Sequence, residues 1–166
     1  MDCNEYYTFN NYMSEKDMSA TEEDYIEMIY RLCEQNNGHT RVNDIAHLLH
    51  VKPPSVTKMV KKLKDLSIVD YKRYGCIQLT KNGIETGRLL VYRHNVIKRF
   101  LTLLEVKGDI HQETEKIEHT INKNTLRGIE RFVLFFEHNP ERLHEFLSYT
   151  NQMEISQNEN SKGKES

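Results

Sequence analysis

The segment from residue 41 to residue 81 constrains the fold most, because two short amphipathic helices and a hairpin follow one another in it. Apolar spacing predicts one helix over 41–50 and a second over 53–64, joined by a tight link. The second helix has Val56, Met59, Val60 and Leu63 on one face and mostly lysines on the other. Two short helices joined in this way are typical of a helix-turn-helix, whose second helix reads DNA.

Two short alternating runs, 68–72 and 76–79, come next and flank a turn that contains Gly75. Such runs around a glycine predict a β-hairpin. A hairpin directly after a recognition helix is typical of the wing of a winged helix. The alternative is an ordinary basic surface helix followed by an unrelated hairpin.

The charge of the chain is unevenly distributed. The net charge of −2 argues against nucleic-acid binding, but residues 41–81 carry nine Lys or Arg and only three Asp, whereas residues 1–30 carry eight acids and one base. A basic block inside an acidic chain indicates a polyanion-binding surface. We therefore expect base-edge contacts from Ser55, Thr57 and Lys58, and phosphate contacts from Lys52, Lys61, Lys62, Lys72 and Arg73.

The remaining periodicity is helical, so the fold class is mainly α. Ser19 and Glu22 form a capping-box pattern that predicts a helix to about residue 36. Further helices are expected over 82–104, 110–121 and 125–137 and from Pro140, and the aromatic stripe of 125–137 suits a subunit interface. The predicted organisation is a flexible tail over 1–18, a DNA-binding domain over 19–81, a helical domain over 82–150 and a disordered tail over 151–166.

Two further features bear on localisation. No apolar run approaches the roughly 20 residues of a membrane span, and the acidic, polar start is unlike a signal peptide. The cysteines are odd in number and widely spaced, at Cys3, Cys33 and Cys76, which favours free thiols. We expect a cytoplasmic protein that does not interact with membranes.

Three residues in the segment 115–119 have the spacing of metal ligands. In a helix, Glu115, Glu118 and His119 lie at i, i+3 and i+4, and so share one face. Oxygen and nitrogen donors at this spacing provide part of a coordination sphere for a divalent cation. Asp24 and Glu27 are a second carboxylate pair, although acids in a first turn also complement the helix dipole. Taken alone, the pattern leaves a solvated charged face as the alternative.

Four segments together, 23–27, 53–60, 90–94 and 115–119, resemble the diphtheria-toxin-repressor family of metal-dependent transcription regulators, and within it the manganese-responsive branch. The resemblance extends over about residues 19–150. It implies a homodimer in which each subunit has an N-terminal winged helix-turn-helix and a C-terminal helical dimerisation domain. It also implies a non-enzymatic repressor of manganese transport and homeostasis genes, which binds a palindromic operator.

The resemblance further implies a metal centre between the two domains, with Mn²⁺ as co-repressor and two ions per subunit. Fe²⁺, Zn²⁺, Cd²⁺ or Co²⁺ would also bind it in vitro. Iron-responsive relatives are expected to have Met and Cys where this chain has the harder ligands Asp24 and Glu115. The alternatives are a winged helix that senses an organic ligand and a binuclear phosphoesterase. The implied ligands are Asp24, Glu27, His94, Glu115, Glu118 and His119.

Overall fold

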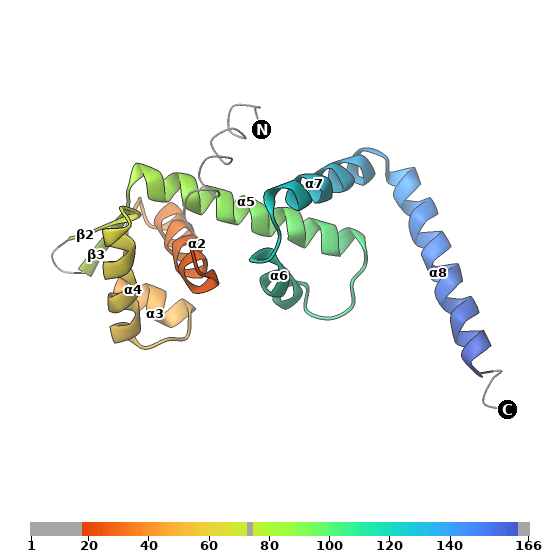
Figure 1. Cartoon of the computed structure of the whole chain (residues 1–166), viewed down its shortest axis with the longest axis horizontal. Coiled ribbons are helices and arrows are strands. Elements are labelled where there is room, and N and C mark those ends of the chain that lie inside the picture. The colour runs from red at the N-terminus through yellow and green to blue at the C-terminus, as the bar shows by residue number, and fades with distance from the viewer. Residues whose placement is uncertain (1–17, 73–74, 163–166) are drawn as a thin grey trace. The chain divides into compact units, whose positions relative to one another are not determined.

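The computed structural model describes residues 18–72 and 75–162, which fall into two units. The first extends to Arg93 and the second begins at His94, so α5 (Lys81–Leu103) contributes to both (Figure 1). The first half of α5 packs with the DNA-binding unit, whereas the sequence places the boundary at residue 81. The described residues confirm a mainly α fold with a winged helix-turn-helix.

The first helix of the described chain, α2 (Ala20–Gln35), begins at the predicted capping box. The Glu22 carboxylate accepts a hydrogen bond from the Ser19 backbone N–H at 2.9 Å, and the Ser19 hydroxyl accepts one from the Glu22 backbone N–H at 3.4 Å. The helix ends where Asn37 and Gly38 adopt positive φ angles of 53° and 83°. Local capping chemistry therefore sets both ends of α2.

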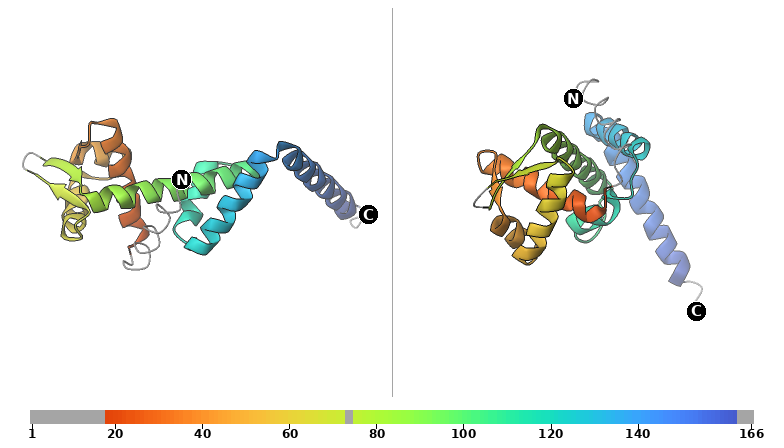
Figure 2. Two further views of the ribbon diagram at one scale, coloured as in Figure 1. Left: turned by 90° about the horizontal axis from the view of Figure 1, so that it is seen from above. Right: turned by 60° about the vertical axis from the view of Figure 1, so that its left-hand side comes forward.

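The helix-turn-helix consists of α3 (Val42–Leu48) and α4 (Pro53–Asp65), which pack around α2 (Figure 2). Pro53 suits the first position of α4 because its missing N–H would have no partner there. The shared core is apolar and fully buried, and includes Ile26, Ile29, Ile45, Val56, Val60 and Leu63. This core fixes α4 while leaving its lysine-rich face in solvent.

The predicted wing is present as β2 (Val69–Tyr71) and β3 (Cys76–Leu79), an antiparallel pair in which Val69 lies opposite Leu79. A third strand, β1 (Thr40–Arg41), pairs with the other edge of β3. The sequence did not predict β1, because two residues are too short for an alternating pattern. Arg41, expected at the start of a helix, belongs to this strand.

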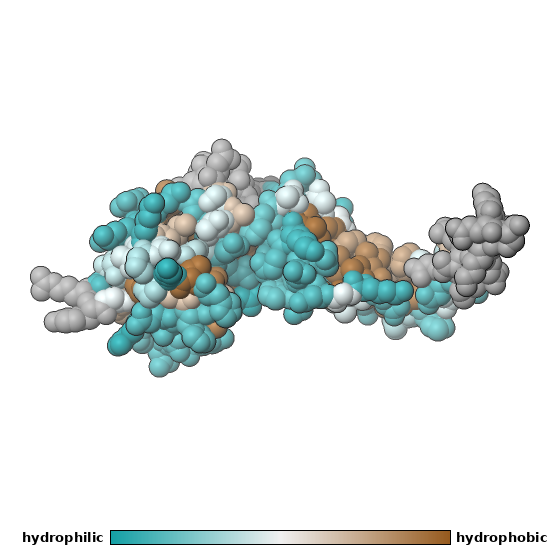
Figure 3. Space-filling model, turned by 90° about the horizontal axis from the view of Figure 1, so that it is seen from below, coloured by the Kyte–Doolittle hydropathy of each residue, from teal (hydrophilic) through white to brown (hydrophobic). Residues whose placement is uncertain are grey.

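The second unit contains the rest of α5 together with α6 (Ile110–Glu118), α7 (Lys123–His138) and α8 (Pro140–Lys162). The rings of Phe100 and Phe132 meet edge to face with centroids 5.4 Å apart, and Phe136 packs on Phe146 at 5.5 Å. Four large apolar side chains of this unit are exposed, namely Leu134, Phe135, Tyr149 and Met153. Figure 3 shows hydrophobic surface, in brown, on one side of the chain.

Three boundaries differ from the sequence expectation or fall outside the described residues. Helix α8 continues to Lys162, whereas a disordered tail was expected from residue 151; the sequence has neither Gly nor Pro between 141 and 162 to interrupt a helix. Helix α6 ends at Glu118 and not at residue 121. The predicted N-terminal tail and Cys3 lie outside the described residues. In the part of the chain that the structure describes, no helix is long and apolar enough to span a membrane.

Cys33 and Cys76 are free thiols in different environments, and a reactivity difference is expected from them. Cys33 is buried and Cys76 is partly exposed. Burial raises the pKa of the Cys33 thiol to about 11, so its thiolate fraction at pH 8 is on the order of 10⁻³. In the native protein, iodoacetamide is expected to label Cys76 well before Cys33, as measured by mass spectrometry of timed samples. Similar native rates would contradict the burial of Cys33, and urea should make the two rates equal.

Candidate functional site

Helix α6 and its C-cap carry three of the six predicted metal ligands. Its N-cap Asp109 accepts hydrogen bonds from the backbone N–H groups of His111 and Gln112, which fixes where the helix begins. From that start, Glu115 and Glu118 lie on the same side of α6, and His119 forms the C-cap with helical backbone angles. The spacing predicted from the sequence is therefore realised on α6.

His94 of α5 faces these carboxylates within the second unit. Its Nδ1 lies 3.0 Å from Oε2 of Glu118 and 3.5 Å from Oε1 of Glu115. Both His94 and Glu118 are buried, with exposed fractions of 4% and 1%. An ionised carboxylate removed from water is costly unless a cation or a donor satisfies it. This arrangement is unusual for a surface helix and excludes a merely solvated charged face at Glu118.

A further imidazole, His111, belongs to the same cluster. Its Nδ1 lies 3.5 Å from Oε1 of Glu115, and its ring is 5.4 Å from that of His94. The ligand atoms of His94, His111 and Glu115 all lie within 4.8 Å of one another. His111 was not among the ligands predicted from the sequence, although it lies four residues before Glu115 and so shares its helix face.

The donor chemistry of this cluster fits a divalent transition metal. Imidazole nitrogens and carboxylate oxygens suit Mn²⁺, Fe²⁺ and Zn²⁺, and affinity alone favours the later metals. His119 Nε2 lies 3.8 Å from Oε1 of Glu118, so its ring is also near the buried carboxylate. The four ligands predicted in this unit, His94, Glu115, Glu118 and His119, thus converge within it.

The other two predicted ligands, Asp24 and Glu27, lie on α2 of the first unit. They are partly buried and one helical turn apart, as their spacing implies. The Glu27 carboxylate accepts two hydrogen bonds from the guanidinium of Arg31, at 2.9 and 2.7 Å. Arg31 offsets the charge of Glu27 within the same helix.

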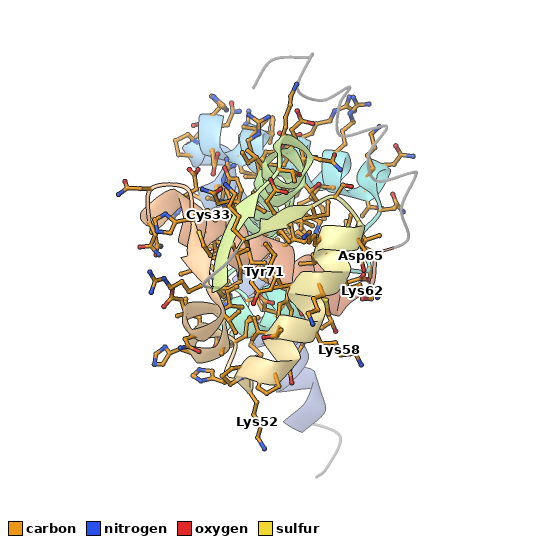
Figure 4. The ribbon with its side chains drawn as sticks, turned by 90° about the vertical axis from the view of Figure 1, so that its left-hand side faces the viewer. Cys33, Lys52, Lys58, Lys62, Asp65 and Tyr71 are labelled. Atoms are coloured by element: carbon orange, nitrogen blue, oxygen red, sulfur yellow. The ribbon has the colours of Figure 1, made fainter. Side chains whose placement is uncertain are left out.

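The predicted DNA-contacting residues lie mostly on the open face of α4. Lys52, Ser55, Lys58 and Lys61 are exposed, and Figure 4 shows Lys52 and Lys58 projecting from the helix. The Thr57 hydroxyl donates to the Pro53 carbonyl at 3.1 Å, and the residue is partly buried. On the wing, the Lys72 ammonium donates to Gln78 Oε1 at 2.6 Å. Arg73 lies outside the described residues.

Lys62 has a partner that the sequence did not reveal. Its Nζ lies 3.0 Å from Oε1 of Glu22, so an ion pair joins α4 to the first turn of α2. The hydrogen bonds from the Ser19 backbone and hydroxyl, together with Lys62, lower the pKa of Glu22 to about 2. Glu22 is therefore ionised at neutral pH. Lys62 is both a candidate phosphate contact and a link between the recognition helix and α2.

A winged helix with an exposed basic face, followed by helices that bring a buried carboxylate and a buried imidazole together with further carboxylate and imidazole groups, defines the class of metal-dependent DNA-binding regulators. Two family models match successive parts of the chain, and both belong to this class of regulator. Residues 17–77 match the iron-dependent repressor N-terminal DNA-binding domain, and residues 80–147 match the iron-dependent repressor metal-binding and dimerisation domain. The chain belongs to the iron-dependent repressor family, which confirms the predicted family and its non-enzymatic class.

Relatives within the family carry a more specific name. The chain is 44% identical over 121 residues to the HTH-type transcriptional regulator MntR of Bacillus pumilus, covering 72% of this chain and 83% of that protein. It is 42% identical over 121 residues to MntR of Bacillus subtilis, covering 72% and 84%.

Solved structures show the same fold. The manganese regulator SloR is 30% identical with a TM-score of 0.62, and MtsR, a metal-dependent transcriptional regulator, is 26% identical with a TM-score of 0.63. Each match covers 71% of this chain and 55% of the other. The chain therefore spans about half the length of these solved relatives.

Proposed function

We propose that this chain is a manganese-dependent transcriptional repressor of manganese transport and homeostasis genes, with Mn²⁺ as its co-repressor. The observation that carries the proposal is the buried pair of His94 and Glu118, with Glu115 beside it. The chain is also similar to proteins named MntR over most of its length.

The proposed metal centre joins residues of both units. Asp24 and Glu27 of α2 would complete the set that His94, Glu115, Glu118 and His119 provide, with two ions per subunit. Bound Mn²⁺ supplies the positive charge that lets carboxylates from both units share one site. Because α2 packs directly on α3 and α4, holding α2 restricts the position of the recognition helix. Metal affinity then contributes to DNA affinity, and DNA must tighten metal binding by the same factor.

We propose that the chain distinguishes Mn²⁺ from other ions by whether the bound ion activates DNA binding, and not by how tightly the ion binds. Carboxylate-rich sites accept Mn²⁺, but Zn²⁺ binds most nitrogen and oxygen sites more tightly. Fe²⁺, Zn²⁺, Cd²⁺ and Co²⁺ are therefore expected to occupy the site in vitro. Only ions that place both units in the DNA-binding arrangement would act as co-repressors.

The proposed target is a palindromic operator bound by a homodimer. The matched C-terminal model is a dimerisation domain, and exposed Leu134 and Phe135 on α7 provide apolar surface for a partner subunit. In a two-fold dimer, the two α4 helices would enter successive major grooves about 34–36 Å apart.

The test is a fluorescence-anisotropy titration with DNA from upstream of the gene that encodes the chain. It is run at fixed salt with chelator, Mn²⁺, Fe²⁺ or Zn²⁺. Tight binding with Mn²⁺ and weak binding in chelator are expected. Equally tight binding in chelator would leave the winged helix as a DNA-binding module but overturn the manganese switch, and the organic-effector alternative would then be favoured.

Lys58→Ala is expected to relax sequence preference without changing metal binding. Lys58 projects from the exposed face of α4, and loss of a base-edge contact typically costs about 1–3 kcal/mol at the contacted position. Competition between the upstream DNA and single-base variants would measure this discrimination. Lys64→Ala removes the same charge from the same helix at a position with no proposed base contact. Equal discrimination by both variants would contradict the role of Lys58.

A further inference from the structure

Two contacts in the first unit fix α5 against α2, and both are unusually specific. In the first, the backbone of α5 approaches Tyr30 of α2 at Gly87. A Cβ atom at Gly87 would lie 2.5 Å from the Cβ of Tyr30 and 2.7 Å from its Cγ. Only glycine permits so close an approach, so this contact sets the separation of the two helices.

The second contact is a buried ion pair. Arg93 Nη2 donates to Oε2 of Glu23 at 2.7 Å, across 70 residues of sequence. The side chains of Arg93 and Glu23 are 2% and 11% exposed. A buried ion pair is weak evidence of stabilisation, because apolar side chains of similar volume often stabilise a fold as well or better. What an ion pair adds is a fixed direction and distance.

The two contacts occur in opposite order along the two helices, so α2 and α5 are antiparallel where they meet. On α2 the contact residues, Glu23 and Tyr30, are seven positions apart, or about two turns; on α5, Gly87 and Arg93 are six positions apart. One contact alone would act as a pivot, whereas two fix both the separation and the direction of the helices. Asp24 and Glu27 lie on α2 between the two contact points, and His94 directly follows Arg93.

We propose that Glu23–Arg93 and Tyr30–Gly87 form a two-point clamp that positions the α2 carboxylates and His94 for one metal centre. The clamp residues are positioning residues and do not themselves bind the metal. This inference rests on the proposed function, because it takes Asp24, Glu27 and His94 as ligands. It explains why the chain keeps a buried charge pair beside two proposed ligands.

The test is a double variant of the full chain, Glu23→Leu with Arg93→Met, which replaces the ion pair by apolar side chains. Thermal melting in chelator and circular dichroism report its fold, and electron paramagnetic resonance of free Mn²⁺ reports metal binding. Folding with a melting temperature near that of the wild type is expected, together with a Kd for Mn²⁺ raised about tenfold or more. A matched control, Glu137→Leu with Arg99→Met, removes the Arg–Glu pair between α5 and α7, and should leave the Mn²⁺ affinity unchanged.

A folded double variant with wild-type Mn²⁺ affinity would overturn the clamp, since the pair would then be merely structural. If the double variant does not fold, Gly87→Ala decides, because it leaves the ion pair intact and forces the two helices apart at the other contact. Weaker Mn²⁺ binding by a folded Gly87→Ala supports the clamp, and wild-type binding overturns it. Failure of the proposed function looks different: the wild type itself, like Glu118→Gln, would then show no Mn²⁺-dependent DNA binding.

Discussion

Replacing Glu118 by glutamine is expected to abolish the manganese response of DNA binding while leaving the fold intact. The carboxylate is 1% exposed and lies 3.0 Å from His94 Nδ1, so the substitution keeps the shape but removes the charge that a cation needs there. Substitution of a residue that merely supports a ligand typically costs 10–100-fold in metal affinity, and loss of a ligand itself should cost about 100-fold or more. Free-Mn²⁺ measurements and anisotropy with the upstream DNA would record the loss.

The matched control for this prediction is Glu113→Gln on the same helix. Glu113 is 39% exposed and pairs with Lys116 at 2.7 Å, away from the cluster. Glu113→Gln removes the same charge from α6 as Glu118→Gln does. Because Glu113 is not a proposed ligand, this variant should retain the full manganese response. In chelator, both variants should bind DNA as weakly as the wild type. A full response from Glu118→Gln would show that the cluster on α6 is not the regulatory metal centre.

Much of the first unit could be predicted because its signals are local. The capping box at Ser19, the apolar spacing of the second short helix and the glycine-containing turn of the wing are each signals within one short stretch of sequence, and the structure confirms all three elements. Strand β1 escaped prediction, because two residues become a strand only through pairing with β3. The continuation of α8 also escaped, because its polar composition was taken as disorder although it contains no helix breaker.

In the metal cluster too, residues close together in the sequence could be predicted, whereas contacts between distant segments could not. Spacing alone placed Glu115, Glu118 and His119 on one face, because they share a helix. His94 could be added only through the family resemblance, since it lies 21 positions before Glu115 with a helix break between them. The ion pairs of Glu22 with Lys62 and of Glu23 with Arg93 depend on how helices pack, and no pattern in the sequence marked them. Consequently, the ligands were easier to predict than the contacts that support them.

Gly83→Ala is expected to be the most destabilising small substitution in the first unit. A Cβ atom there would lie 2.0 Å from the Ile68 carbonyl oxygen and 2.9 Å from Cδ2 of Leu79. The Ile68 oxygen cannot easily move, because it accepts hydrogen bonds from the backbone N–H and the hydroxyl of Thr80. Overpacking typically costs about 1–3 kcal/mol, and we expect the upper end or more. Urea unfolding of the metal-free protein, followed by circular dichroism, would measure the free energy of unfolding.

Gly128→Ala is the control, because it adds the same methyl group where no heavy atom lies within 4 Å. In the interior of α7, alanine should stabilise the helix by up to about 1 kcal/mol. The two variants should therefore shift the unfolding free energy in opposite directions. Because the clash at Gly83 lies between the start of β2 and the start of α5, the first variant should also weaken DNA binding in the presence of Mn²⁺. Equal stabilities for the two variants would contradict the close packing of α5 against the wing.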